Sequence, residues 1–161
     1  MPRVGIFQRD KTWIPQLLIR LITRYPILRR HPHPFFVHFP MVFLFGGAIF
    51  MVLHLVRPQL APFEKVAFLM LIMGILFTPP AIVSGLWTWW IAYSWRVPPQ
   101  ILYKIILAIA LLLTEIVSLL LRIGHPFDRT ARGWVYFALM LFIAIDALTI
   151  GYFGGQLTYG Y

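Results

Sequence analysis

Histidine is the residue type in this sequence best suited to holding a redox cofactor. His33 lies just ahead of a long apolar stretch, His38 lies within it, His54 lies near its end, and His125 follows another such stretch. Imidazole is a common axial ligand of haem and can also hydrogen-bond a quinone headgroup. The candidate cofactor contacts are therefore His33, His38, His54 and His125, for haem b or for a quinone.

The spacing of the histidines limits how a haem could be held. His38 and His54 would be about 24 Å apart along one helix, so they could serve two stacked haems but never one. His54 and His125 should lie at the same end of the protein, but Gly124 and Pro126 place His125 in a loop.

A histidine cluster precedes and enters the first apolar stretch, with the spacing His-x-His-x4-His from His31 through His33 to His38. This spacing could hold a metal ion or present an imidazole to a quinone headgroup. The plainer interpretation is that these imidazoles cap a helix, bind loop carbonyls and meet lipid phosphates. We predict no metal site.

Glu115 and Asp146 are the two acids that fall inside apolar stretches. Carboxyl groups in hydrocarbon are rare enough to be functional candidates, and proton relay is the corresponding function. The structural alternative is a protonated acid that donates a hydrogen bond to another helix, as we expect for Asp146. At 1.5 Å per residue, Glu115 and Asp146 lie about 10 Å and about 18 Å from their helix ends, so they are not level.

The composition requires that these residues be positioned by membrane-spanning helices. The chain is 60% hydrophobic and 12% charged, against about 45–50% and about 25% in soluble domains. A span needs about 20 mostly apolar residues. Four stretches qualify: Phe35–Val56, Lys65–Tyr93, Gln100–Ile123 and Trp134–Phe153. The predicted fold class is all-α, a bundle of four transmembrane helices over residues 35–161.

Prolines and small residues mark special positions along these spans. Thr78-Pro79-Pro80 should kink the second span and free backbone carbonyls. Small residues allow close approach of helices, and we expect packing faces at three places. They are Gly46-Gly47, Ala81 with Gly85, and Gly151 with Gly155.

Residues 1–34 form a basic segment with seven of the fourteen Lys and Arg residues: Arg3, Arg9, Lys11, Arg20, Arg24, Arg29 and Arg30. This charge predicts a cytoplasmic N-terminus. Four spans then return the C-terminus to the cytoplasm, so that His33 and His38 lie at the cytoplasmic surface of the inner membrane.

Apolar residues recur at helical spacing over residues 13–25, which predicts an amphipathic helix in the interface. The arginines at 20 and 24 argue against a cleaved signal peptide.

Other classes of function are disfavoured. The chain has no cysteine, which excludes disulfides and covalent c-type haem. It has no glycine-rich phosphate loop, nucleophile elbow or zinc-protease helix motif, so we assign no catalytic residue and expect a non-enzyme. The net charge of +9 is matched by anionic lipid, and we expect no nucleic-acid partner.

Three segments resemble a known family. His33-Pro34-Phe35-Phe36-Val37-His38-Phe39-Pro40 resembles the HPxxVHFP signature of DUF2231, a family of uncharacterised integral membrane proteins. Residues 80–89, PAIVSGLWTW, resemble its second-span pattern, and residues 151–159, GYFGGQLTY, resemble its C-terminal GWxGGxLVY. The resemblance covers all four spans.

The resemblance also implies an association with electron transfer. The chain departs from the family pattern at two places. Many members carry a histidine near the start of the third span and an acid in the second-span motif. Here those places read Leu102-Tyr103-Lys104 and Trp87-Thr88-Trp89. A haem site transferred from relatives would therefore lack one ligand.

Our functional hypothesis is a small integral membrane subunit of a larger electron-transfer complex, respiratory or photosynthetic. The subunit would act as an anchor and line a quinone site. Its partners would be membrane lipids and the other subunits. The alternatives are a b-type haem-binding membrane cytochrome and a small transporter, for which the Pro79-Pro80 break and the two buried acids are the support.

Overall fold

Four long α-helices make up the body of the computed structural model, which describes residues 20, 24–25, 33–59, 62–93 and 97–159. They are α2 (His33–Val56), α3 (Pro62–Tyr93), α4 (Pro99–Arg122) and α5 (Ala131–Tyr159). Each is long and apolar enough to cross a membrane. The predicted class, an all-α bundle of four spanning helices, is confirmed. The amphipathic helix predicted over residues 13–25 lies almost wholly outside the described residues.

The helix boundaries follow from prolines and one glycine. Pro62 and Pro99 each open a helix, where the missing N–H of proline has no intrahelical partner to lose. Gly124, with φ of +73°, lies in the turn after α4. The observed bounds match the predicted spans closely, although α5 continues past Phe153 to Tyr159. The helix α3 runs through Pro79 and Pro80 without interruption.

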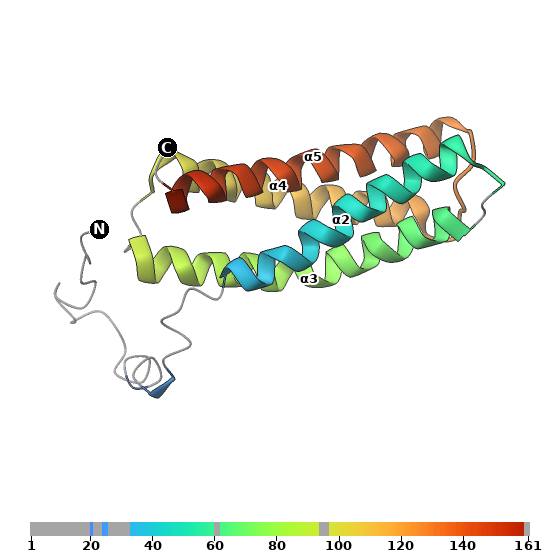
Figure 1. Ribbon diagram of the computed structural model, residues 1–161. Coiled ribbons are helices and arrows are strands. Elements are labelled where there is room, and N and C mark those ends of the chain that lie inside the picture. The colour runs from blue at the N-terminus through green and yellow to red at the C-terminus, as the bar shows by residue number, and fades with distance from the viewer. Residues whose placement is uncertain (1–19, 21–23, 26–32, 60–61, 94–96, 160–161) are drawn as a thin grey trace.

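The four helices lie side by side and alternate in direction (Figure 1). The helix α2 packs most extensively on α3, and α4 packs on α5, while contacts of α2 with α5 and of α3 with α4 close the ring. One end of the bundle, here called the His33 end, holds the starts of α2 and α4 and the ends of α3 and α5. The other, the Arg122 end, holds the remaining helix termini.

The core of the bundle is apolar and lies nearest to the Arg122 end. Its fully buried members include Leu44, Met51, Leu71, Met140 and Ile143. Large apolar side chains also face outward on all four helices, where a bilayer would cover them; examples are Val42, Leu76, Leu113 and Ile145. Helices that are apolar on every side suit a membrane interior.

Glycines allow close helix packing at most of the expected places. A Cβ added at Gly47 would lie 3.1 Å from the Met140 side chain, and one added at Gly151 would lie 2.9 Å from Met41. The prediction was wrong for Gly155, where an added Cβ would meet no atom of the described residues within 4 Å. The spacing of small residues marks a face of a helix, but it does not specify how far along that face the neighbour reaches.

Candidate functional site

The imidazole of His33 connects the start of α2 to α3. Its Nδ1 lies 3.1 Å from Ser84 Oγ, and the Ser84 hydroxyl donates to the Ala81 carbonyl at 2.8 Å. Because a hydroxyl carries one proton, the neutral His33 must donate from Nδ1 to Ser84, which leaves Nε2 as an acceptor. Gly85 makes room for the ring, since a Cβ there would lie 3.0 Å from His33 Cε1.

Lys104 is a cation at the His33 end and lies on α4. It is half-buried near the start of α4, close enough to His33 to interact electrostatically. Its Nζ would lie 3.5 Å from a Cβ added at Gly154, so α5 also borders it. The four carboxylates of the described residues, Glu64, Glu115, Asp128 and Asp146, lie in the middle of the bundle or toward its other end. An ammonium and an imidazole therefore stand here without a described carboxylate at their own level.

An apolar groove of about 210 Å³ lies on the surface between α4 and α5 at this end. Its lining residues are Tyr103, Ile106, Leu107, Thr149 and Phe153. The rings of Tyr103 and Phe153 lie 5.4 Å apart. The hydroxyl of Thr149 donates to the Ile145 carbonyl, which leaves its methyl group to the groove. The groove suits a hydrocarbon chain.

His38 does not join His33 at a shared site. Its Nδ1 contacts the carbonyl of Pro34 on its own helix, and its side chain is exposed. This contact fits the plainer interpretation of the cluster, in which an imidazole satisfies a local carbonyl. His31 lies outside the described residues. Of the predicted contacts at this end, His33 is the one that bridges two helices.

The buried acids lie in the middle of the bundle. Glu115 is fully buried and its Oε1 accepts a 2.8 Å hydrogen bond from Thr78 of α3. Asp146 is 3% exposed. The two carboxyl groups are near enough to interact electrostatically, although counting along the helices placed them at different depths. The structure therefore places the two acids within electrostatic range of each other, although they are not hydrogen-bonded to one another.

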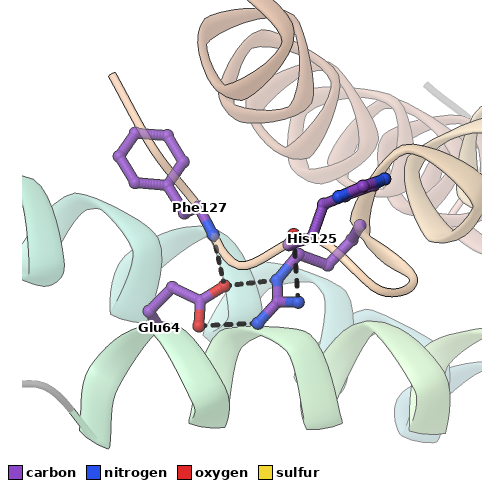
Figure 2. Close-up of polar contacts among 4 residues, drawn as sticks. Glu64, His125 and Phe127 are labelled. Atoms are coloured by element: carbon purple, nitrogen blue, oxygen red, sulfur yellow. Dashed lines mark hydrogen bonds and ion pairs between the residues drawn. The ribbon is translucent and has the colours of Figure 1, made fainter. Parts of the chain in front are cut away.

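A buried ion pair organises the Arg122 end (Figure 2). Arg122 donates from Nε to Glu64 Oε1 and from Nη2 to Glu64 Oε2, the latter at 2.8 Å. This two-bond arrangement is the strongest geometry between guanidinium and carboxylate. Arg122 and Glu64 are 9% and 7% exposed. The pair joins the end of α4 to the start of α3.

The same pair holds the loop that leads into α5. Arg122 Nη1 donates to the His125 carbonyl at 3.2 Å, and the Phe127 amide donates to Glu64 Oε1 at 3.4 Å, as Figure 2 shows. The guanidinium lies 4.6 Å from the centre of the Phe68 ring. The ion pair and its two loop contacts therefore fix α3, α4 and the loop in one arrangement.

In the same loop, the hydrogen bond from the Thr130 hydroxyl lowers the pKa of the exposed Asp128 carboxyl group.

The two remaining histidines lie at the Arg122 end with different surroundings. The ring of His54 meets Phe127 edge to face at 5.7 Å, and its buried Nδ1 has no hydrogen-bond partner among the described residues. His125 lies in the loop, as predicted, and is exposed. The structure thus places an aromatic ring, Phe127, against His54.

Neither Glu64 nor Arg122 was assigned a role from the sequence. The available signal was the opposite charge of two residues at the ends of neighbouring antiparallel spans, Glu64 at the start of one and Arg122 at the end of the next. Ser84 was also missed. A hydroxyl in a span ordinarily bonds to a carbonyl of its own helix, so the second contact of Ser84 with His33 had no local signal.

Comparison with known protein families gives a match over most of the chain. The model of the family DUF2231, described as a predicted membrane protein, matches residues 30–161. No curated protein matches the chain, and no solved structure matches it.

Proposed function

The chain belongs to the DUF2231 family of predicted membrane proteins, and from that premise we propose that it is a small integral membrane subunit of an electron-transfer complex. In this proposal the subunit anchors its partners in the bilayer and contacts a quinone at the His33 end. The redox partner of the quinone belongs to another subunit.

The proposal rests on one observation. The three segments that resemble the family signatures meet at the His33 end. His33 comes from the first segment, Ser84 and Gly85 come from the second, and Gly154 comes from the third. Lys104 lies among them. Residues from four helices therefore surround one place, and two of them carry hydrogen-bonding groups with capacity left for a ligand.

The chemistry of these groups matches a quinone. Quinone carbonyls accept hydrogen bonds, and the Lys104 ammonium is a donor. A quinol hydroxyl is a donor, and neutral His33 offers Nε2 as an acceptor. The isoprenoid tail is apolar, and the groove beside Tyr103 and Phe153 is apolar and open to the lipid. The two redox forms of the headgroup thus find complementary partners.

The proposal is tested by measuring how much quinone the full chain retains when it is extracted from its own membranes in a mild detergent. We expect about one quinone per chain by solvent extraction and chromatography. Lys104→Met and His33→Phe should each lower retention about tenfold, since one hydrogen bond to a charged or buried group contributes about 1.5 kcal/mol. Lys65→Met removes an exposed lysine at the Arg122 end and should change nothing.

Native mass measurement of the same preparation tests the subunit role. We expect a mass that exceeds the 18.8 kDa chain because redox subunits remain attached. A preparation in which the chain is alone and carries no quinone would contradict the proposal. Equal retention in Lys104→Met and Lys65→Met would reject the His33 end as the site.

The orientation of the bundle is a separate prediction. The positive charge of residues 1–34 precedes α2, so the His33 end should face the cytoplasm. The chain has no cysteine, so single cysteines at Val97 and Asp128 report the two ends directly. In intact cells, an impermeant thiol reagent should label Asp128→Cys and spare Val97→Cys until the cells are opened. The reverse pattern would invert the topology.

A further inference from the structure

The middle of the bundle holds more buried oxygens than hydrogen-bond donors. Glu115 Oε2, both carboxyl oxygens of Asp146 and the Ser118 hydroxyl are buried without a hydrogen-bond partner among the described residues. Ser118 is fully buried one turn from Glu115 on the same face of α4. Its hydroxyl is thus an unpartnered polar group beside the acids. The Thr78 hydroxyl is already used by Glu115 Oε1.

The prolines of α3 add acceptors next to this group. Pro79 and Pro80 have no N–H, so the carbonyls of Ile75 and Leu76 lose their donors four residues on. Thr78, which binds Glu115, lies within the same turn of α3. Thr78 therefore lies beside backbone carbonyls that have lost their helical donors.

No cation of the described residues lies at the level of the acids. Along α4, Lys104 is about 16 Å from Glu115 and Arg122 is about 10 Å away at 1.5 Å per residue, and Arg122 is bound to Glu64. The other titratable groups on the described helices lie toward the two ends: His33, His38, Tyr103 and Tyr152 on one side, and His54, Lys65, Arg132 and Tyr136 on the other.

Two ionised carboxylates cannot be stable in this place. A single unpaired charge within a membrane costs at least about 2.5 kcal/mol, and mutual repulsion would add to the cost for two. Protonation removes both charges and supplies two O–H donors to the unpartnered oxygens. Protonation of both acids therefore accounts for the shortage of hydrogen-bond donors and avoids the cost of two buried charges.

We propose that Glu115 and Asp146 form a proton-binding site in the middle of the bundle, where each carboxyl group holds an exchangeable proton. The Thr78 hydroxyl, which donates to Glu115 Oε1, is the hydrogen-bond partner that the described residues give this site. The site is separate from the His33 end, so it stands or falls independently of quinone binding.

Modification by dicyclohexylcarbodiimide tests the site in the full chain in lipid nanodiscs. This apolar reagent adds across a carboxylic O–H: the acid oxygen bonds to the central carbon, and the proton moves to nitrogen. We expect one adduct on the peptide with Glu115 or Asp146 by mass spectrometry. Its yield should fall about tenfold per pH unit above the midpoint, as the protonated fraction does.

Glu64 is the matched control, because it is buried but ionised against Arg122 and should remain unmodified. Glu115→Gln and Asp146→Asn should each remove their own adduct. Asp146→Asn should also keep the wild-type melting temperature, since an amide is the neutral isostere of the acid.

Three results would overturn the proposal: no adduct on either acid, a yield that does not depend on pH, or protection by sodium at constant pH, which would indicate a cation site instead. If either variant fails to fold, the wild type decides the question by infrared spectroscopy. The carbonyl band of a protonated carboxylic acid should then disappear at high pH and return on reacidification, and a missing band would reject the site.

Discussion

Replacing Arg122 by methionine while Glu64 remains should lower the free energy of unfolding by about 3–5 kcal/mol. The change leaves a buried carboxylate without its partner, and it also removes the donor to the His125 carbonyl. Glu64→Gln in the presence of Arg122 should have a comparable cost. Equilibrium unfolding in mixed micelles measures both.

The chain provides its own control for this pair. Arg132 and Asp128 form an exposed pair at 3.6 Å, one turn apart. Arg132→Met should change the free energy of unfolding by less than about 1 kcal/mol, because solvent screens such pairs. The double variant Glu64→Leu/Arg122→Met should recover most of the lost stability, since well-packed apolar residues can replace a buried pair. Equal effects of Arg122→Met and Arg132→Met would show that burial does not determine how much an ion pair contributes to the stability of this protein.

Gly133→Ala should be the most damaging of the glycine substitutions, with a loss of about 3 kcal/mol at the upper end of the range for overpacking. An added Cβ would overlap the carbonyl oxygen of Asp128 and lie 3.0 Å from its carbonyl carbon. The obstacle is backbone rather than a flexible side chain. The loop must therefore move, and with it the Phe127 amide that binds Glu64.

Gly155→Ala is the matched control on the same helix. A Cβ there meets nothing within 4 Å in the part of the chain that the structure describes, and alanine is favoured over glycine within a helix by about 0.5–1 kcal/mol. This variant should be as stable as the wild type or slightly more stable. If the two alanine variants melted at the same temperature, the close approach of Asp128 to Gly133 would not be a constraint on the fold.

The Arg122–Glu64 ion pair and the close packing at Gly133 indicate that the Arg122 end stabilises the fold. Arg122, Glu64 and Gly133 hold α3, α4 and the loop before α5 in one arrangement. The His33 end holds the His33 imidazole near Lys104, and the middle holds carboxyl oxygens without a hydrogen-bond partner among the described residues. We therefore expect substitutions at the Arg122 end to change stability, and substitutions of Lys104 to change ligand retention while the fold is kept.

Local features of the sequence were enough to predict the membrane fold. The length and apolarity of four stretches specify spanning helices because these properties are compared with a fixed bilayer thickness. Gly124 and Pro126 place His125 in a loop for reasons of backbone geometry within a few residues. Glu115 and Asp146 stood out because a carboxyl group is costly in hydrocarbon wherever it lies.

Contacts between helices required the three-dimensional arrangement. The helices α2, α3 and α5 are apolar on every side and carry little periodic signal for which face is turned inward, and the axial shift of all four helices follows from packing against their neighbours. For this reason the partner of Arg122, the contact of His33 with Ser84 and the proximity of Glu115 to Asp146 were not predicted. Gly155 shows the same limit, because whether a small residue is packed depends on the neighbouring helix and not on its own.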